Sequence, residues 1–414
     1  MTSPLRAFTN RRTAVLTGLG FSSGLPSVLV ADTLQAWMSK SRVDLPTIAI
    51  VTGAVGWPYA LKFLWAPLVD RETLPFLGRR RGWLLATQIL VAAAIVALGL
   101  GGRPGDIGGF AAMAFLVSFF SATQDIVADA YRTDVLRPEE LGAGAAVFTT
   151  GYRVGMVASG AGALALAGAG LSWSAVYAIA ACAMIVGVAA TFLAPEPEHH
   201  TERTGSFASA VTVPLRALLA RADGPTALAF VAVFKLPDVI GASYATPFLL
   251  DRGYTLTQLA AVRGLVGVGI GIAGTICGGA VVVRLGIRRS LWIFGVLHAV
   301  TNLGFCLLSR AEPNLAAMTA VIVIENFCIG LATAGFMAFL MSRCDARHSA
   351  SQYALLTALV ALTRYAVVMP LGAVQVAIGW TWFFALATIV GLPSLFLIPR
   401  LRLPGDEPPT APAE

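Results

Sequence analysis

Two carboxylates and a guanidinium stand at the end of an apolar run, in the segment Ser121–Arg132 with the sequence SATQDIVADAYR. Asp125 and Asp129 are four residues apart and therefore share one face of a helix, and Arg132 follows within one further turn. A carboxylate that takes up a proton in one state and pairs with a cation in another can couple proton flow to the movement of a second solute. The residues alone leave an alternative open, in which the charges form a structural salt bridge or lie close enough to a membrane surface to be solvated.

The composition of the chain indicates that these charges lie within a membrane protein. The chain has 414 residues, of which 57% are hydrophobic and 12% are charged, and its mean hydropathy is +0.76. Soluble proteins carry about 25% charged residues, so the chain is predicted to be an integral membrane protein. Apolar runs of the length that crosses a bilayer as a helix recur along the whole chain. A carboxylate at bilayer depth costs at least about 2.5 kcal/mol, so charged residues inside these runs are functional candidates.

Membrane-spanning helices are predicted to position these residues. The first apolar run follows a basic N-terminal segment, and we interpret it as a membrane helix rather than a signal peptide. The twelve expected spans are 13–38, 46–67, 83–102, 108–132, 142–168, 173–194, 223–250, 257–284, 289–309, 315–342, 351–378 and 379–399. Lys and Arg concentrate in the loops on the side of the N-terminus, so the positive-inside rule predicts that both termini are cytoplasmic. The net charge of +7 therefore reflects membrane topology and does not indicate binding to nucleic acid.

One long polar segment divides the chain into two sets of six spans. The sequence predicts an N-terminal six-helix bundle over 1–194, a cytoplasmic linker over 195–222, a C-terminal six-helix bundle over 223–399 and a disordered Pro-rich tail over 400–414. The linker holds His199 and His200, but two adjacent histidines without further ligands do not indicate a metal site. The five cysteines are spaced singly, so neither a metal nor a cofactor is expected.

The two halves repeat a Gly- and Arg-rich turn after corresponding spans. The first copy, PLVDRETLPFLGRRRGW, follows the second span, and the second copy, GGAVVVRLGIRRS, follows the eighth. Repeated halves with substrate bound between them are typical of secondary transporters. The turns resemble the cytoplasmic loop motif of the major facilitator superfamily, in which charge pairs lock the two halves in one access state. The resemblance implies a gating role for Asp70, Arg71, Gly78, Arg79, Arg80 and Arg288.

Positively and negatively charged residues inside the predicted spans are nearly equal in number, which indicates that they form ion pairs. Lys235 and Asp238 are three residues apart on one helix and can pair with each other. The expected partners of Asp125 and Asp129 are Lys62 and Arg153, and Glu325 is expected to form a similar set with Asn326 and Arg364. The predicted proton-coupling network is therefore Asp125, Asp129, Lys62, Arg153, Lys235, Asp238, Glu325 and Arg364, of which roughly half are expected only to fix helix packing.

Aromatic and polar side chains on the same helices are the expected lining of a substrate cavity. The candidates are Asp32, Gln35, Trp57, Tyr59, Tyr152, Phe234, Arg263, Asn326 and Tyr353. Other Trp and Tyr residues near span ends are expected to anchor the protein at the membrane interface. A cavity with this lining suits a bulky, partly apolar ligand that carries anionic oxygens.

Nearly the whole chain resembles the AmpG-like branch of the major facilitator superfamily. The matching stretches are FSSGLPSVLVADTLQAWM, PYALKFLWAPLVDR, LGRRRGWLLATQ, SATQDIVADAYRTDVL, GAGAAVFTTGYRVGM, GGAVVVRLGIRRSL, IENFCIGLATAGFMAFLMSRC and SQYALLTALVALTRY. The resemblance implies an all-α integral membrane protein with the major facilitator fold and a proton-driven importer of the bacterial inner membrane. The branch holds importers of anhydro-muropeptides and single-polypeptide siderophore importers of the FptX/RhtX type.

Chain length and three residues favour a siderophore over a muropeptide as substrate. Muropeptide permeases of the branch tend to be longer than this chain, which ends soon after the twelfth predicted span. Pro237 stands where their pattern has Gly, Arg263 where it has Lys, and Asp32 where it has a small uncharged residue. The resemblance therefore implies an importer closest to the pyochelin permeases, with ferric pyochelin as the expected substrate and a muropeptide as the alternative.

Two other classes of protein fit the sequence less well. A membrane-embedded enzyme is not expected, because no HExxH pattern occurs and Asp125 and Asp129 lie on one helix, whereas aspartyl dyads usually come from separate helices. An assembly factor on the same fold has no need of titratable groups at bilayer depth. The expected partners are a small-molecule siderophore, with or without iron, together with protons and membrane lipid, and the chain is expected to be a monomer.

Overall fold

The structure, a computed structural model, describes residues 7–8, 10–197 and 207–403. Within these ranges the chain is almost entirely helical and contains no strand. Nine helical segments of the described residues are long and apolar enough to cross a membrane. The all-α membrane fold is therefore confirmed, and twelve spans stay a prediction that is consistent with the helix bounds. The linker residues 198–206, including His199 and His200, and the tail residues 404–414 lie outside the described part.

The helices from α2 to α11 carry the predicted N-terminal bundle. A π-helical turn, Leu29–Thr33, joins α2 (Arg11–Val28) to α3 (Leu34–Lys40), and a 3-10 turn, Lys62–Leu64, follows α4 (Leu45–Leu61) and precedes α5 (Ala66–Arg71). Next come α6 (Arg79–Gly101), α7 (Ile107–Val135) and α8 (Leu141–Val157), which continues through the π-helical turn Ala158–Gly162 into α9 (Ala163–Gly168). The set ends with α10 (Trp173–Ala183) and α11 (Ile185–Leu193).

The helices from α12 onward carry the rest of the described chain. The first, α12 (Phe207–Leu219), is followed by α13 (Gly224–Phe234), α14 (Leu236–Asp251) and the short α15 (Leu256–Leu259). A π-helical segment, Ala260–Gly267, leads into α16 (Val268–Arg310), and then come α17 (Leu315–Ser342) and α18 (Ser349–Leu397), which ends in the 3-10 turn Ile398–Arg400.

Polar residues at loop ends explain where several helices begin. The side chains of Asp44, Asp106, Ser172 and Asn314 each accept a hydrogen bond from the backbone N–H three residues on, at 2.9, 3.2, 3.3 and 3.1 Å. Such a cap satisfies one of the free N–H groups at a helix start and contributes about 1 kcal/mol. The predicted span starts at 46, 108, 173 and 315 lie within one residue of these helix starts.

Two long helices, α16 and α18, are each broken at one glycine. Gly286 (φ 77°, ψ 168°) and Gly379 (φ 73°, ψ 168°) have positive φ angles in a region that only glycine adopts readily. Gly78, in the matching turn of the first half, has nearly the same conformation (φ 89°, ψ −175°). The turn that the sequence repeats is therefore repeated in the backbone, and each long helix consists of two legs.

We expect Gly286→Ala to lower the stability of the protein by about 1–3 kcal/mol, the usual cost of holding another residue in this backbone region. A Cβ at position 286 meets no atom within 4 Å, so the cost comes from conformation rather than from packing. Gly269→Ala, in a helical part of α16 and also in open space, is the matched control and should leave stability unchanged or raise it slightly. Thermal denaturation in detergent measures the difference, and equal midpoints for the two variants would contradict the expectation.

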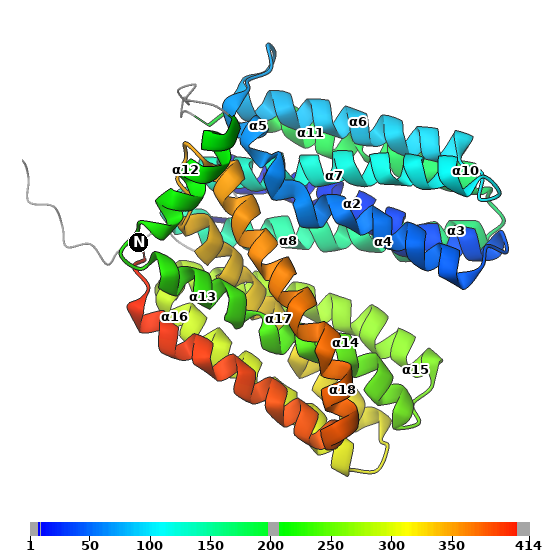
Figure 1. Ribbon diagram of the computed structural model, residues 1–414, viewed down its shortest axis with the longest axis vertical. Coiled ribbons are helices and arrows are strands. Elements are labelled where there is room, and N and C mark those ends of the chain that lie inside the picture. Colours follow the sequence, from blue (N-terminus) through cyan, green and yellow to red (C-terminus); the bar gives the residue numbers. More distant parts are fainter. Residues whose placement is uncertain (1–6, 9, 198–206, 404–414) are drawn as a thin grey trace, which may run out of the picture.

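Two helical bundles meet at one end of the molecule and diverge toward the other (Figure 1). The bundle drawn at the top holds α2 to α11, and the one below it holds α13 to α18. They meet near α5 and α12, which we call the linker end, and they separate toward α3, α10 and α15, which we call the open end.

Small residues bring α8 and α16, from different bundles, into close contact. A Cβ at Gly142 would lie 2.6 Å from the Cβ of Val282, and one at Gly279 would lie 2.5 Å from the Cβ of Ala146. Membrane helices approach most closely where small residues face each other, because the backbones can then touch. This contact helps to hold the bundles together at the linker end.

Candidate functional site

Asp129, on α7, binds two cations in the interior of the N-terminal bundle. Its Oδ2 lies 3.3 Å from Nζ of Lys62, and its Oδ1 lies 2.8 Å from Nη2 of Arg132. All three residues are buried, so each charge depends on the others for stabilisation. Lys62 stands on the 3-10 turn after α4, which brings its ammonium group to α7. The predicted pairing of Lys62 with the α7 carboxylates is present.

Asp125, one turn earlier on α7, is buried but holds no ion pair within the described residues. Its Oδ1 also has no hydrogen-bond partner there. The charges that act on it are Lys62, Asp129 and Arg132, and it acts in turn on Tyr59 and Tyr152. Asp125 can therefore take up a proton without breaking an ion pair, whereas Asp129 cannot.

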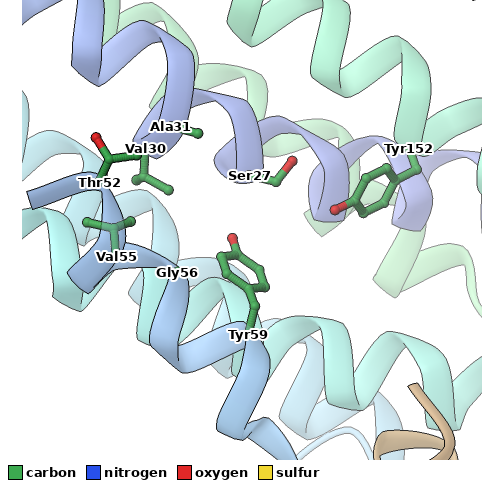
Figure 2. Close-up of a pocket in the computed structure, with 8 residues that line it drawn as sticks. All are labelled: Ser27, Val30, Ala31, Thr52, Val55, Gly56, Tyr59 and Tyr152. Atoms are coloured by element: carbon green, nitrogen blue, oxygen red, sulfur yellow. The ribbon is translucent and has the colours of Figure 1, made fainter. Parts of the chain in front are cut away.

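A cavity of about 230 Å³ lies between the first span, α4 and α8. Its lining is entirely uncharged and consists of Ser27, Val30, Ala31, Thr52, Val55, Gly56, Tyr59 and Tyr152. Figure 2 shows the hydroxyl groups of Tyr59 and Tyr152 pointing from two sides into the space near Ser27. Tyr59 also donates a hydrogen bond of 2.9 Å to the Ser121 hydroxyl, one turn before Asp125. The cavity thus offers hydroxyl and apolar contacts to a ligand beside a buried carboxylate.

Asp70, at the end of α5, joins the two bundles at the linker end. Its Oδ2 accepts hydrogen bonds from the backbone N–H and the hydroxyl of Ser351, at 2.8 and 2.7 Å, and its Oδ1 accepts one from the N–H of Ala350 at 3.2 Å. These donors lie in the first turn of α18, where the free N–H groups and the helix dipole favour a negative charge. Arg79 and Arg80 lie 3.4 and 2.9 Å from the same carboxylate.

Arg80 makes a second connection between the bundles. It is completely buried, its Nε donates to Asp134 at 2.7 Å, and its Nη2 donates to the Ser349 hydroxyl of α18 at 2.7 Å. Asp134 is not among the predicted site residues, although a third carboxylate so close to Asp125 and Asp129 in the sequence was the available signal. The Gly- and Arg-rich turn of the first half and the adjoining Asp70 therefore bind the start of α18 through two side chains.

Arg132 connects Asp129 to the second bundle. Its guanidinium hydrogen-bonds to the hydroxyl of Tyr353 on α18 and lies 4.4 Å from the ring centroid of Phe148 and 4.8 Å from that of Tyr353. A desolvated cation–π contact contributes up to about 2 kcal/mol. Tyr353 is completely buried in this contact, which corrects its predicted place in a substrate cavity. A change of charge at Asp129 would act directly on the contact between the bundles.

In the C-terminal bundle, Lys235 hydrogen-bonds to Asp238, as their spacing predicted. Lys235 also donates to the hydroxyl of Thr333 on α17 at 3.2 Å. The pair therefore joins the start of α14 to α17, inside the bundle.

Two cations lie away from their predicted partners. Arg153 makes no ion pair within the described residues and points into the other bundle, where a Cβ at Gly271 would lie 2.5 Å from its Nη1 and Asp238 is the charge that acts on it. Its neighbour Tyr152 faces the cavity, and successive residues of a helix point about 100° apart, so Arg153 faces the interface instead. Arg364 is exposed on α18, and the cation that acts on Glu325 is Arg263.

Two further predicted residues reach neither a cavity nor the contact between the bundles. Phe234 is 2% exposed and stacks on Phe336 at 5.4 Å between ring centroids, so it belongs to the core. Arg288 donates to the backbone carbonyls of Ile398, Pro399 and Leu401, at 3.0, 3.1 and 2.5 Å. Because free carbonyls at a helix end attract a guanidinium, the second copy of the turn fastens the end of α18 within its own bundle.

The remaining predicted residues are dispersed, and their roles stay predictions. Asp32 is exposed on the first π-helical turn, Gln35 is half-buried on α3, and Trp57 is 60% exposed beside Gly56 of the cavity. Arg263 hydrogen-bonds to Thr246, Asn326 donates to the carbonyl of Ile322 at 2.9 Å, and Arg71 pairs with Glu72 at 3.3 Å near the surface.

His298 and Asn302, on α16, are buried polar residues that the predictions did not include. They are four residues apart in the apolar run WIFGVLHAVTNLGF. Their spacing was a usable signal, because it is the same one that distinguishes Asp125 and Asp129.

Comparison with known proteins identifies the family. The sequence profile of the Major Facilitator Superfamily matches residues 13–365. The chain belongs to this superfamily. Solved members share its fold at low sequence identity. The Escherichia coli fucose:proton symporter has a TM-score of 0.71 at 11% identity, over 94% of this chain and 97% of that one. The proton:xylose symporter XylE has a TM-score of 0.69 at 12% identity, over 97% and 96%.

Closer relatives place the chain among AmpG-type transporters. It is 42% identical over 395 residues to the anhydromuropeptide permease of Escherichia coli strain K12, which is 95% of this chain and 80% of that protein. It is 32% identical over 394 residues to the putative transporter AmpG 4 of Rickettsia conorii, over 93% of this chain and 95% of that protein. The chain is thus a multi-pass membrane transporter of the AmpG type.

The expectation of a siderophore importer is wrong. The 42% identity to an anhydromuropeptide permease supports the muropeptide alternative and leaves the likeness to pyochelin permeases, the iron-uptake role and the siderophore partner unsupported. Chain length misled the choice, because the permease is longer and yet matches 95% of this chain, so the extra length does not separate the two groups. Single substitutions at Asp32, Pro237 and Arg263 do not define the substrate either.

Proposed function

We propose that the protein is a proton-driven importer of anhydromuropeptides across the bacterial inner membrane, with both termini in the cytoplasm. The observation that carries the proposal is the 42% identity to the anhydromuropeptide permease over 95% of this chain. The linker end is then the cytoplasmic end, and residues 1–194 and 223–399 are the two bodies that move against each other about the linker 195–222.

Substrate enters where the bundles diverge, and one part of it binds in the cavity beside Tyr59 and Tyr152. Asp125 takes up a proton from the same side, and the bound substrate then covers it. With Asp125 neutral, Lys62 acts on Asp129 alone, so Asp129 binds Arg132 less tightly and Arg132 loses its hold on α18. The bundles part at the linker end, and substrate and proton leave to the cytoplasm.

Radiolabelled uptake tests the proposal in bacterial cells that lack their own importers. Cells that express the protein should accumulate an anhydromuropeptide, and a protonophore should abolish the accumulation. Ferric pyochelin serves as the control substrate and should not enter above background. Failure to take up the anhydromuropeptide while the protein is present in the membrane would overturn the proposal.

Filling the cavity should block transport without unfolding the protein. Gly56 lines the cavity, and a Cβ there meets no atom within 4 Å, so Gly56→Leu places its side chain in open space. We expect the KM for the anhydromuropeptide to rise about tenfold or more, corresponding to at least about 1.4 kcal/mol of lost binding. Gly53→Leu, one turn earlier on α4 and also in open space but outside the cavity lining, is the matched control. Equal KM values for both variants would exclude the cavity as the binding site.

A further inference from the structure

A second set of buried polar side chains lies in the C-terminal bundle, apart from Asp125 and the cavity of Figure 2. His298 and Asn302 lie on one face of the second leg of α16 and are 2% and 3% exposed. Within the described residues neither ring nitrogen of His298 has a hydrogen-bond partner, nor has Oδ1 of Asn302. Buried polar groups nearly always have a partner, so this set marks a place where a proton-carrying group can donate a hydrogen bond.

Charged groups from several helices act electrostatically on this set or on the residues around it. The titratable and charged groups concerned are Lys235 and Asp238 at the start of α14, Glu325 on α17, Arg263 on the segment Ala260–Gly267 and Arg153 of the other bundle. Lys235 and Asp238 are the two that act on the His298 ring. The ring therefore lies in the electrostatic field of one Lys–Asp pair, with Asn302 one turn further along its own helix.

Asn302 and Glu325 bring two oxygen atoms together at Gly241. A Cβ at this glycine would lie 2.9 Å from Oδ1 of Asn302 and 3.3 Å from Oε1 of Glu325. Both oxygens thus approach the same backbone position, and a hydrogen-bond donor between them would stabilise both. A protonated Glu325 carboxyl supplies that donor, either directly or through a water molecule.

The two bundles carry matching sets of charges. Lys62 pairs with Asp129 in the first bundle, as Lys235 pairs with Asp238 in the second. Each bundle also has a second buried carboxylate, Asp125 or Glu325, that holds no ion pair among the described residues. The set in the second bundle thus has the parts of the proposed proton site in the first.

We infer that Asp238, His298, Asn302 and Glu325 form a second proton-binding site, so that two protons cross with each substrate molecule. The inference rests on the proposed function. The proton adds to the Glu325 carboxylate, near Oδ1 of Asn302, and the buried His298 ring, on the same face of α16 as Asn302, is a second proton acceptor of this site. No other co-reactant is needed, because the proton gradient supplies and removes the proton.

The ratio of protons to substrate tests this inference in proteoliposomes that hold the full-length protein, with the membrane potential clamped at zero and a radiolabelled anhydromuropeptide as the probe. Steady-state accumulation rises about a hundredfold per unit of pH difference for two protons and about tenfold for one. We expect a hundredfold rise for the unaltered protein and a tenfold rise for Glu325→Gln and for His298→Asn. Thr301→Val is the matched control and should keep the hundredfold rise, because the Thr301 hydroxyl donates to the backbone carbonyl of His298 rather than to the site.

The outcomes separate the inference from the proposed function. Exchange of labelled for unlabelled substrate verifies that each variant still binds and carries the substrate. If one variant fails to fold, the other is sufficient for the test. A tenfold rise for the unaltered protein, or a hundredfold rise that persists in both variants, would overturn the second site and leave the proposed function intact. Absence of any accumulation by the unaltered protein would overturn the proposed function and the inference with it.

Discussion

Asp125→Asn should lower the steady-state accumulation of anhydromuropeptide about tenfold for each unit of imposed pH difference, while exchange of substrate across the membrane continues. One pH unit supplies about 1.4 kcal/mol per proton, which is a factor of ten in accumulation. Asparagine has the shape of aspartate but cannot carry the proton. Because Asp125 holds no ion pair within the described residues, the pairs around Asp129 stay intact and the variant should remain folded.

Two comparisons make this result specific. Asp44→Asn, at the exposed N-cap of α4, should accumulate substrate as the unaltered protein does. Asp129→Asn should instead lose exchange as well as accumulation, because it leaves Lys62 and Arg132 without their buried partner at a cost of about 3–5 kcal/mol. If Asp125→Asn accumulated substrate to the unaltered level at every pH difference, Asp125 would not be a coupling carboxylate.

Asp70→Asn should open the linker end and slow import at least about tenfold. The substitution removes the negative charge that binds Arg79, Arg80 and the first turn of α18, and losing one partner of a buried charge set costs about 3 kcal/mol or more. A single cysteine at position 350 measures the opening, since Ala350 is 1% exposed with the bundles in contact. In a background without the native cysteines, Ala350→Cys should react with a thiol reagent at least about tenfold faster when combined with Asp70→Asn.

The control for this experiment is a second acidic residue. Glu139→Gln, on the 3-10 turn Pro138–Glu140 before α8, alters an exposed carboxylate and should change neither the labelling nor the import rate. Unchanged labelling in the Asp70→Asn background would show that this carboxylate does not hold the bundles together.

The local features of the fold could be predicted from sequence, because they depend on neighbours along the chain. Helix starts follow from capping residues such as Asp44 and Asn314, and the pairing of Lys235 with Asp238 follows from their spacing on one helix. The repeated turn at Gly78 and Gly286 was visible as a motif, and its shared backbone conformation explains why glycine stands there. Apolar runs of membrane length were sufficient to identify the fold class.

Contacts between helices were harder to predict, because the charge of a residue and its position in a predicted span do not determine the direction in which its side chain points. Lys62 meets Asp129 as expected, whereas Arg153 turns away from the same carboxylates toward Gly271. Arg288 resembles Arg80 in sequence, but it binds carbonyls at the end of its own bundle, while Arg80 crosses to α18.

The substrate could not be derived from the site residues at all. A cavity of hydroxyl and apolar groups beside a buried carboxylate is compatible with many partly polar ligands. Chain length and three substitutions pointed to a siderophore, and identity over nearly the whole chain corrected that choice. The buried charges thus support a proposal about mechanism rather than about the transported substrate.

Proton movement itself is the most direct test of coupling between the buried carboxylates and the cargo. Proteoliposomes that hold the protein in a lightly buffered medium should take up protons when an anhydromuropeptide is added outside, and a pH electrode should record alkalinisation of the medium. Asp125→Asn should give a smaller signal, and combining it with Glu325→Gln should abolish the signal. Uptake of the anhydromuropeptide without any change in external pH would contradict proton-coupled import.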